Sequence, residues 1–134
     1  MQNIPFNGTL PFNNDSPAQA GGITRTGDTI TIPLGGDYLV SFVVTIAIRN
    51  ELNTPSVGVF LGPPFNEVPN VQTRFELVSI NLGGNCLQLS GEAIITIPAG
   101  SQLQLRNTST SMDLFTLCSN EINNVALNII KLSA

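Results

Sequence analysis

The residue types that carry most enzyme chemistry are scarce in this sequence. Its 134 residues include no histidine, one lysine (Lys131) and two cysteines (Cys86 and Cys118). Histidine is the usual general acid or base near neutral pH and the usual partner of a nucleophilic serine or cysteine, so both arrangements are excluded. A serine–lysine nucleophile would have to use Lys131, which lies in the last apolar run of the chain. We therefore assign no catalytic residue.

Paired carboxylates are the remaining route to acid–base catalysis, as in glycosidases. The nine acidic residues stand singly along the chain, most of them near turn-forming residues: Asp15, Asp28, Asp37, Glu51, Glu67, Glu76, Glu92, Asp113 and Glu121. This spacing favours solvated turn residues. An enzyme with an unrecognised carboxylate pair stays open as a rival, which two acids in one pocket would support.

The pattern also lacks the usual ligand sets of metals and cofactors. The two cysteines are 32 positions apart, with neither a CxxC pair nor a histidine to complete a zinc site. The segment 12–16, "FNNDS", has oxygen atoms that a calcium ion could use, but such residues more often form Asx-turns. We expect no metal and no cofactor. Cys86 and Cys118 either form one bridge or stay as two small buried hydrophobes, and the sequence leaves both alternatives open.

Charge and hydropathy exclude two kinds of partner. The net charge is −4, the isoelectric point is about 4.4, and the five cations are scattered, so no track for nucleic-acid phosphates exists. No apolar run reaches 18 residues, which predicts no membrane insertion, and no signal peptide is visible at the start. Only 10% of residues are charged. Neutral polar surfaces of this kind suit a protein that meets other surfaces, where buried charges would be costly.

Short β-branched runs between glycine, proline and asparagine breaks predict an all-β fold. We expect a single domain over residues 1–134, built from eight to ten antiparallel strands as a sandwich or jelly roll, with a first strand and a surface loop in residues 1–21. Alternating or apolar runs predict strands within 28–33, 35–49, 56–61, 73–82, 86–98, 101–107, 111–118 and 123–132. The segment 62–73 has three prolines and is expected to be irregular.

The run 35–49 has one apolar face and a second face of mixed character. Its even positions are all apolar from Tyr38 to Ile48, whereas its odd positions include Leu39, Val43 and Ala47 among polar residues. An apolar stripe exposed to water is unusual in monomers. We predict that Leu39, Val43 and Ala47 are covered by contact with another copy of the chain. The alternative is a monomer in which a loop such as 62–73 covers that face.

The order of the motifs resembles a known family. A strand, a proline and a Gly-x-Tyr corner (Gly36 to Tyr38) precede the long strand, "IPAGSQLQL" follows at 97–105, and a last strand ends near the C-terminus. This order resembles the tumour-necrosis-factor-like jelly roll of complement globular heads. It looks most like the C-terminal domains of collagen-like glycoproteins and basal-layer proteins of the Bacillus spore exosporium. The turn differs from the family pattern in having Ser101 where aspartate is usual. The given residues include no collagen repeat, so we expect either a head cut from a longer chain or a stand-alone member.

The resemblance implies an antiparallel jelly-roll β-sandwich of about ten strands and a homotrimer, with Leu39, Val43 and Ala47 as the predicted trimer interface. It also implies a non-enzymatic structural role at the spore surface or elsewhere outside the cell, among spore-surface proteins or glycans. A receptor- or glycan-binding module, such as a phage tail tip, is the alternative from another class. Pro64, Phe65 and Asn66 form the expected partner-contact loop, because Phe65 is the clearest candidate for an exposed aromatic ring. The hydroxyl-rich stretch 107–111, if exposed, could accept O-linked sugar.

Overall fold

The structure, a computed structural model, describes residues 3–12, 22–47, 55–69, 73–76, 86–109, 114–118 and 125–132. Within these ranges every regular element is a strand. The strands are β1 (Asn3–Ile4), β2 (Thr24–Thr26), β3 (Thr29–Ile32), β4 (Gly36–Ala47), β5 (Ser56–Gly62), β6 (Asn66–Glu67), β7 (Phe75–Glu76), β8 (Cys86–Ile97), β9 (Ser101–Asn107), β10 (Phe115–Leu117) and β11 (Val125–Lys131). Each described pairing is antiparallel. The all-β antiparallel prediction is confirmed.

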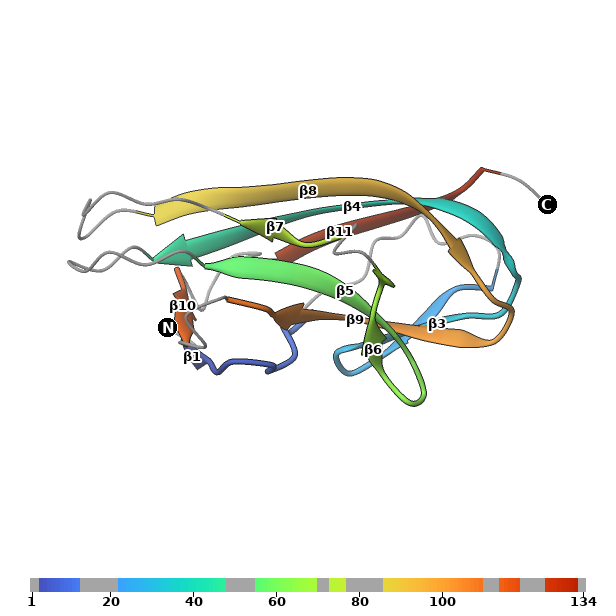
Figure 1. Cartoon of the computed structure of the whole chain (residues 1–134), viewed down its shortest axis with the longest axis horizontal. Helices are drawn as coiled ribbons and strands as arrows, with labels where there is room; N and C mark the ends of the chain where they lie inside the picture. Colours follow the sequence, from blue (N-terminus) through green and yellow to red (C-terminus); the bar gives the residue numbers. More distant parts are fainter. Residues whose placement is uncertain are drawn as a thin grey trace.

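The strands form two sheets that lie face to face (Figure 1). In sheet A, β4 lies between β8 on one side and β11 and β10 on the other, and β1 pairs with β10. Sheet B has the order β2-β3-β9-β5-β6, and β7 also pairs with β5. Neighbouring strands are therefore often distant in the sequence, as in a jelly roll.

Strand β4 shows the predicted alternation. Its even positions from Tyr38 to Ile46 are buried, and its odd positions are partly or fully exposed. Strand β8 follows the predicted odd phase, with Leu89, Ile95 and Ile97 buried. A strand turns successive side chains to opposite faces, so each pattern directs one row of side chains into the space between the sheets.

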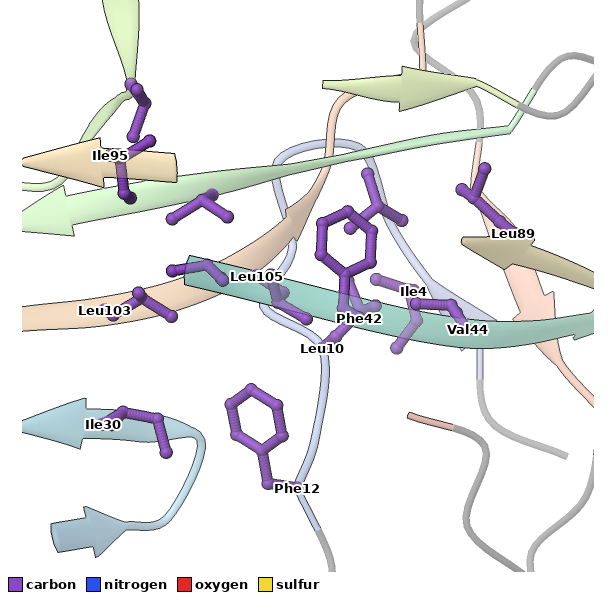
Figure 2. Packing of buried hydrophobic residues seen from close by; sticks show 14 of the residues in the cluster. Ile4, Leu10, Phe12, Ile30, Phe42, Val44, Leu89, Ile95, Leu103 and Leu105 are labelled. Carbon is purple, nitrogen blue, oxygen red and sulfur yellow. The ribbon is translucent and has the colours of Figure 1, made fainter. Parts of the chain in front are cut away.

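The core between the sheets draws on both layers and on the N-terminal segment. Figure 2 shows part of this cluster, which includes Phe42 and Val44 of β4 and Leu103 and Leu105 of β9. Leu10, just past the short first strand, is also fully buried. We expected residues 1–21 to be a first strand followed by a surface loop; the described part of this segment, 3–12, fills the core at Ile4, Leu10 and Phe12. Residues 13–21 lie outside the described ranges.

The connections follow the predicted turn chemistry in part. Gly100 has a φ of 78°, which glycine adopts without steric cost, and the Ser101 amide donates to the Pro98 carbonyl to close the "PAGS" turn. In the segment 62–73, expected to be irregular, residues 66 and 67 form the two-residue strand β6 at the margin of sheet B. The predicted phase change near residues 78 and 79 lies outside the described ranges.

The start of the hydroxyl-rich stretch 107–111 is buried, contrary to the exposure assumed for O-glycosylation. Asn107 is fully buried; its amide donates to the Ile4 carbonyl (2.9 Å) and accepts from the Ser109 backbone (2.9 Å). The Ser56 and Thr108 hydroxyls lie 2.6 Å apart and are also buried. These groups satisfy one another's hydrogen bonds where water is excluded, so residues 107–109 are structural. Residues 110 and 111 lie outside the described ranges.

Candidate functional site: the outward face of sheet A

The face of sheet A that points away from the core has an apolar row across three strands. Leu39 of β4 is paired with Ile94 of β8 on one side and with Ile130 of β11 on the other. Ile94 is 57% exposed and Ile130 is 52% exposed, while Leu39 between them is partly buried. Leu132, next on the same side of the chain, is 51% exposed. These four residues are called the apolar row below.

The next two outward-facing positions along β4 are Ser41 and Val43. Ser41 is paired with Glu92 and Asn128, and Val43 is paired with Ser90 and Ala126. These six residues line a hollow of about 430 Å³, together with Gly91, Phe42 and Phe75. The side chains of Ser41, Val43, Ser90 and Ala126 are smaller than the isoleucines of the apolar row, so the face has a ridge beside a depression. Such relief is suited to receiving a side chain from a second surface.

Gly91 lies behind this depression, on the core side of β8. A Cβ atom at this position would lie 2.4 Å from Cδ2 of Phe75 and 2.6 Å from Cζ of Phe42. The two rings pack edge to face, with centroids 5.9 Å apart. Glycine is therefore required here by the close approach of two aromatic rings, one from each sheet.

The outward face ends at a disulfide bond. Cys86 of β8, which is paired with Ala47, is bonded to Cys118, whose backbone amide donates to the Thr45 carbonyl. The bridge thus joins chain segments on the two sides of β4. Of the two alternatives left open by the sequence, the structure has the bridged form, and no free cysteine is found among the described residues.

The three predicted interface residues all lie on this outward face, but in different surroundings. Leu39 belongs to the apolar row, Val43 lines the hollow, and Ala47 lies beside Cys86 of the disulfide. The described part of the 62–73 loop pairs with β5 in sheet B, so residues 62–69 do not cover this face. Whether Leu39, Val43 and Ala47 form an interface stays a prediction.

The sequence interpretation missed Ile94 and Ile130, the most exposed members of the row. A signal was present, because each stands next to a second isoleucine in a strand that otherwise alternates. Two adjacent apolar residues in a strand must point to opposite faces, so one of them points outward. Only the register of β8 and β11 against β4 shows that both outward isoleucines flank Leu39.

The predicted partner-contact loop lies on the other sheet. Pro64 and Asn66 are exposed, whereas Phe65 is partly buried because its ring lies over the Arg106 guanidinium of β9 at 5.3 Å. No described contact with a partner tests this prediction. Phe65 packs on its own sheet but stays partly exposed, and contact of Pro64, Phe65 and Asn66 with a partner stays a prediction.

Charged groups are few on both sheets. Arg74 donates two hydrogen bonds to the Glu67 carboxylate, one of them from Nε at 2.9 Å, and this bonding raises the pKa of Arg74 above its usual range. The described residues contain no cluster of three or more side chains that could bind a metal ion. In the same ranges, no helix is long and apolar enough to cross a membrane.

Comparisons with known proteins identify the fold. No protein-family model matches the chain, and no curated protein matches it. Among solved structures, the Eiger tumour necrosis factor of S. frugiperda aligns with a TM-score of 0.68 and 16% identity over 98% of this chain and 85% of its own. The globular domain of zebrafish complement 1qA aligns at 0.59 and 14%, over 98% and 95%. Murine APRIL aligns at 0.60 and 13%, over 85% and 80%.

These alignments confirm the predicted fold. The chain has the tumour-necrosis-factor-like jelly roll that is shared by tumour necrosis factors and complement globular heads. Sequence identities of 13–16% establish the architecture and no particular activity. Function has to be argued from the surfaces of this chain.

Proposed function

We propose that this protein is a non-enzymatic structural module that assembles as a homotrimer through the outward face of sheet A. The observation that carries the proposal is the apolar row, in which exposed Ile94 and Ile130 flank Leu39 across three paired strands. Burying such a row removes apolar surface from water, which favours association. A threefold arrangement is supported by the likeness of the fold to proteins that work as trimeric modules.

The neighbouring hollow gives this contact its shape. Ser41 and Val43 lie at the level of the hollow, one and two outward positions beyond Leu39 on the same strand. In a cyclic trimer each copy presents one surface to a different surface of the next copy. A ridge of isoleucines beside a hollow of small side chains fits such a contact, because the ridge of one copy can enter the hollow of its neighbour.

The cellular setting belongs to the same proposal. We place the module at the surface of a bacterial spore, as the head of an exosporium filament, an appendage tip or an anchoring protein. Its motif order supports this placement, as do the low charge and the disulfide, since disulfides persist outside reducing compartments. A closed pair of sheets and a shared subunit interface would suit a protein exposed to harsh conditions.

Light scattering after size exclusion tests the assembly. We expect three times the mass of one 14.2 kDa chain, and a melting temperature that rises with protein concentration because association stabilises the folded state. A monomeric mass across the concentration range would reject the proposal.

Val43→Asp and Ile94→Asp test the surface. Each places a charge on the outward face without altering the core, and we expect monomers that keep their β-sheet circular dichroism. Leu34→Asp is the matched control: Leu34 is 52% exposed but lies in the connection from β3 to β4, so it should remain trimeric. Trimers in both test variants would place the interface elsewhere.

A further inference from the structure

The outward face of sheet B holds an arginine between two aromatic rings. The guanidinium carbon of Arg106 lies 4.8 Å from the ring centre of Phe60 and 5.3 Å from that of Phe65. Phe60 belongs to β5, Arg106 to β9, and Phe65 to the connection that projects below the sheets in Figure 1. The three side chains are each partly exposed. They are called the stacked arginine site below.

A glutamine holds the guanidinium in place. Nε and Nη2 of Arg106 donate to Oε1 of Gln104 at 3.0 and 2.8 Å. The amide nitrogen of Gln104 in turn donates to the hydroxyl of Thr29 on β3 at 2.9 Å. Both rings and this chain of hydrogen bonds fix the plane of the guanidinium. The Arg106 side chain is thus already ordered in the folded protein, so ligand binding costs little further side-chain entropy.

The same contacts leave donors unused. A guanidinium has five N–H groups, and two are taken by Gln104. Among the described residues, none accepts a hydrogen bond from Nη1 of Arg106 or from the second hydrogen of Nη2. Two neighbouring N–H groups on a fixed, planar cation match the two oxygens of a carboxylate.

We propose that the stacked arginine site binds the carboxylate of an acidic sugar, such as a uronic acid at the end of a glycan. The carboxylate pairs with the free edge of Arg106, and the C–H face of the sugar ring packs against Phe60 or Phe65. The site lies on sheet B, so the proposal does not depend on assembly through sheet A and leaves that face free for it.

The surroundings favour a sugar over an acidic peptide. The partly exposed side chains around the site include five neutral hydrogen-bonding groups, namely Thr9, Thr29, Thr31, Gln102 and Gln104. The Glu67 carboxylate also lies nearby, since Glu67 is paired with Phe60, but its charge is balanced by Arg74. Hydroxyls and amides of this kind suit sugar hydroxyl groups. An acidic peptide would need several cations, but the nearby Arg74 is already paired with Glu67. One cation beside neutral groups and a charge-balanced ion pair fits a ligand with one negative charge and many hydroxyls.

Two small probes that differ in one group test the site. Methyl β-D-glucuronide and methyl β-D-glucoside share a ring, but only the first has a carboxylate. Each is titrated into the native protein and followed by ¹H–¹⁵N nuclear magnetic resonance. We expect weak binding of the glucuronide, with a dissociation constant on the order of millimolar, and at least about tenfold weaker binding of the glucoside. Shifted amides should cluster at residues 58–66 and 102–108.

Variants identify the groups responsible. Arg106→Gln should abolish the preference for the glucuronide, and Phe65→Ala should weaken binding of both probes. Lys131→Gln is the matched control, because it removes the same charge from β11 of sheet A, on the opposite layer from the site, and it should keep the preference. Melting curves check folding. If Arg106→Gln is unstable, Arg106→Lys keeps the charge, and we expect it to reduce the preference at least about threefold.

Three results would overturn the proposal. Equal binding of the two probes by the native protein, or no binding of either, rejects a carboxylate site. An undiminished preference in a folded Arg106 variant rejects the assigned residue. Binding of N-acetyl-aspartate as tight as that of the glucuronide, at the same amides, rejects a sugar as the ligand class.

Discussion

Gly91 shows how one residue without a side chain fixes the distance between two sheets. Its position on β8 lets the rings of Phe42 and Phe75 approach the strand from the core side. The sequence shows a glycine within an alternating strand, which suggests a bulge or a close approach. Only the packed structure identifies the approach and the two rings that make it.

Gly91→Ala should destabilise the fold by about 1–3 kcal/mol, because the added methyl group overlaps both rings and neither sheet can move away freely. Chemical denaturation followed by circular dichroism measures the change. Ser90→Ala, one residue earlier and pointing outward, should change stability by less than about 0.5 kcal/mol. Equal stability of the native protein and Gly91→Ala would show that the rings have room to move.

At the residue scale, the sequence indicates Phe65 as a candidate contact residue but does not indicate Arg106. The flanking proline and asparagine indicate Phe65 as a candidate contact residue. Arg106 is one of five scattered cations in the sequence, and no local pattern distinguishes it from the others. Phe65 and Arg106 are 41 positions apart in the sequence and are brought together by the pairing of β5 with β9. No local sequence pattern predicts such a contact.

At the scale of elements, β4 organises sheet A. It pairs with β8 along its whole length and with β11 and β10 in succession on its other side. Period-two alternation predicted the inner face of β4 correctly, since burial of one face is a property of the strand itself. The surroundings of the outer face depend on the neighbouring strands. The sequence therefore predicted an apolar outer face on β4, but it did not predict that Ile94, Ile130 and the disulfide lie beside it.

The disulfide should stabilise this end of the sheet. Cys86 and Cys118 lie on segments that flank β4, with Cα atoms 6.0 Å apart. We expect the Cys86→Ser and Cys118→Ser variants each to lose about 3 kcal/mol, because the unfolded chain is no longer constrained by the bridge. The corresponding fall in melting temperature is about 10 °C.

Reduction provides the matched test. A reducing agent should lower the melting temperature of the native protein by a similar amount and leave both serine variants unchanged. Thiol titration of the denatured, unreduced protein should detect no free cysteine. Two titratable thiols would show that the bridge is absent.

At the scale of the whole molecule, the two sheets have outward faces of different chemistry. Sheet A presents an apolar ridge and a hollow, whereas sheet B presents neutral polar side chains around a stacked arginine. Assembly through sheet A would leave sheet B facing outward. One fold can therefore combine a structural face with a contact face, because the sheets turn them in opposite directions (Figure 1).

The proposed location at a spore surface can be tested by antibody labelling. Antibodies raised against the folded protein should label intact spores of the organism that encodes it in immunogold electron microscopy. Antibodies whose epitope includes Arg106 should label spores as strongly as antibodies to other exposed regions, because the proposed trimer leaves the outward face of sheet B accessible. Labelling only after the spores are broken open, or of vegetative cells alone, would contradict the proposed location.

The sequence by itself determined the all-β class, the boundaries of most long strands, the buried row of each, and the absence of histidine chemistry. These properties need no information about distant contacts, because alternation and turn residues depend on a few neighbouring positions and composition does not depend on residue order. The tertiary structure decided which strands are neighbours and in what register. That pairing, between segments up to about a hundred positions apart, placed Ile94 and Ile130 beside Leu39, bridged Cys86 to Cys118 and set Arg106 between two rings. Register is fixed by the packing of the whole core, and no single segment contains it.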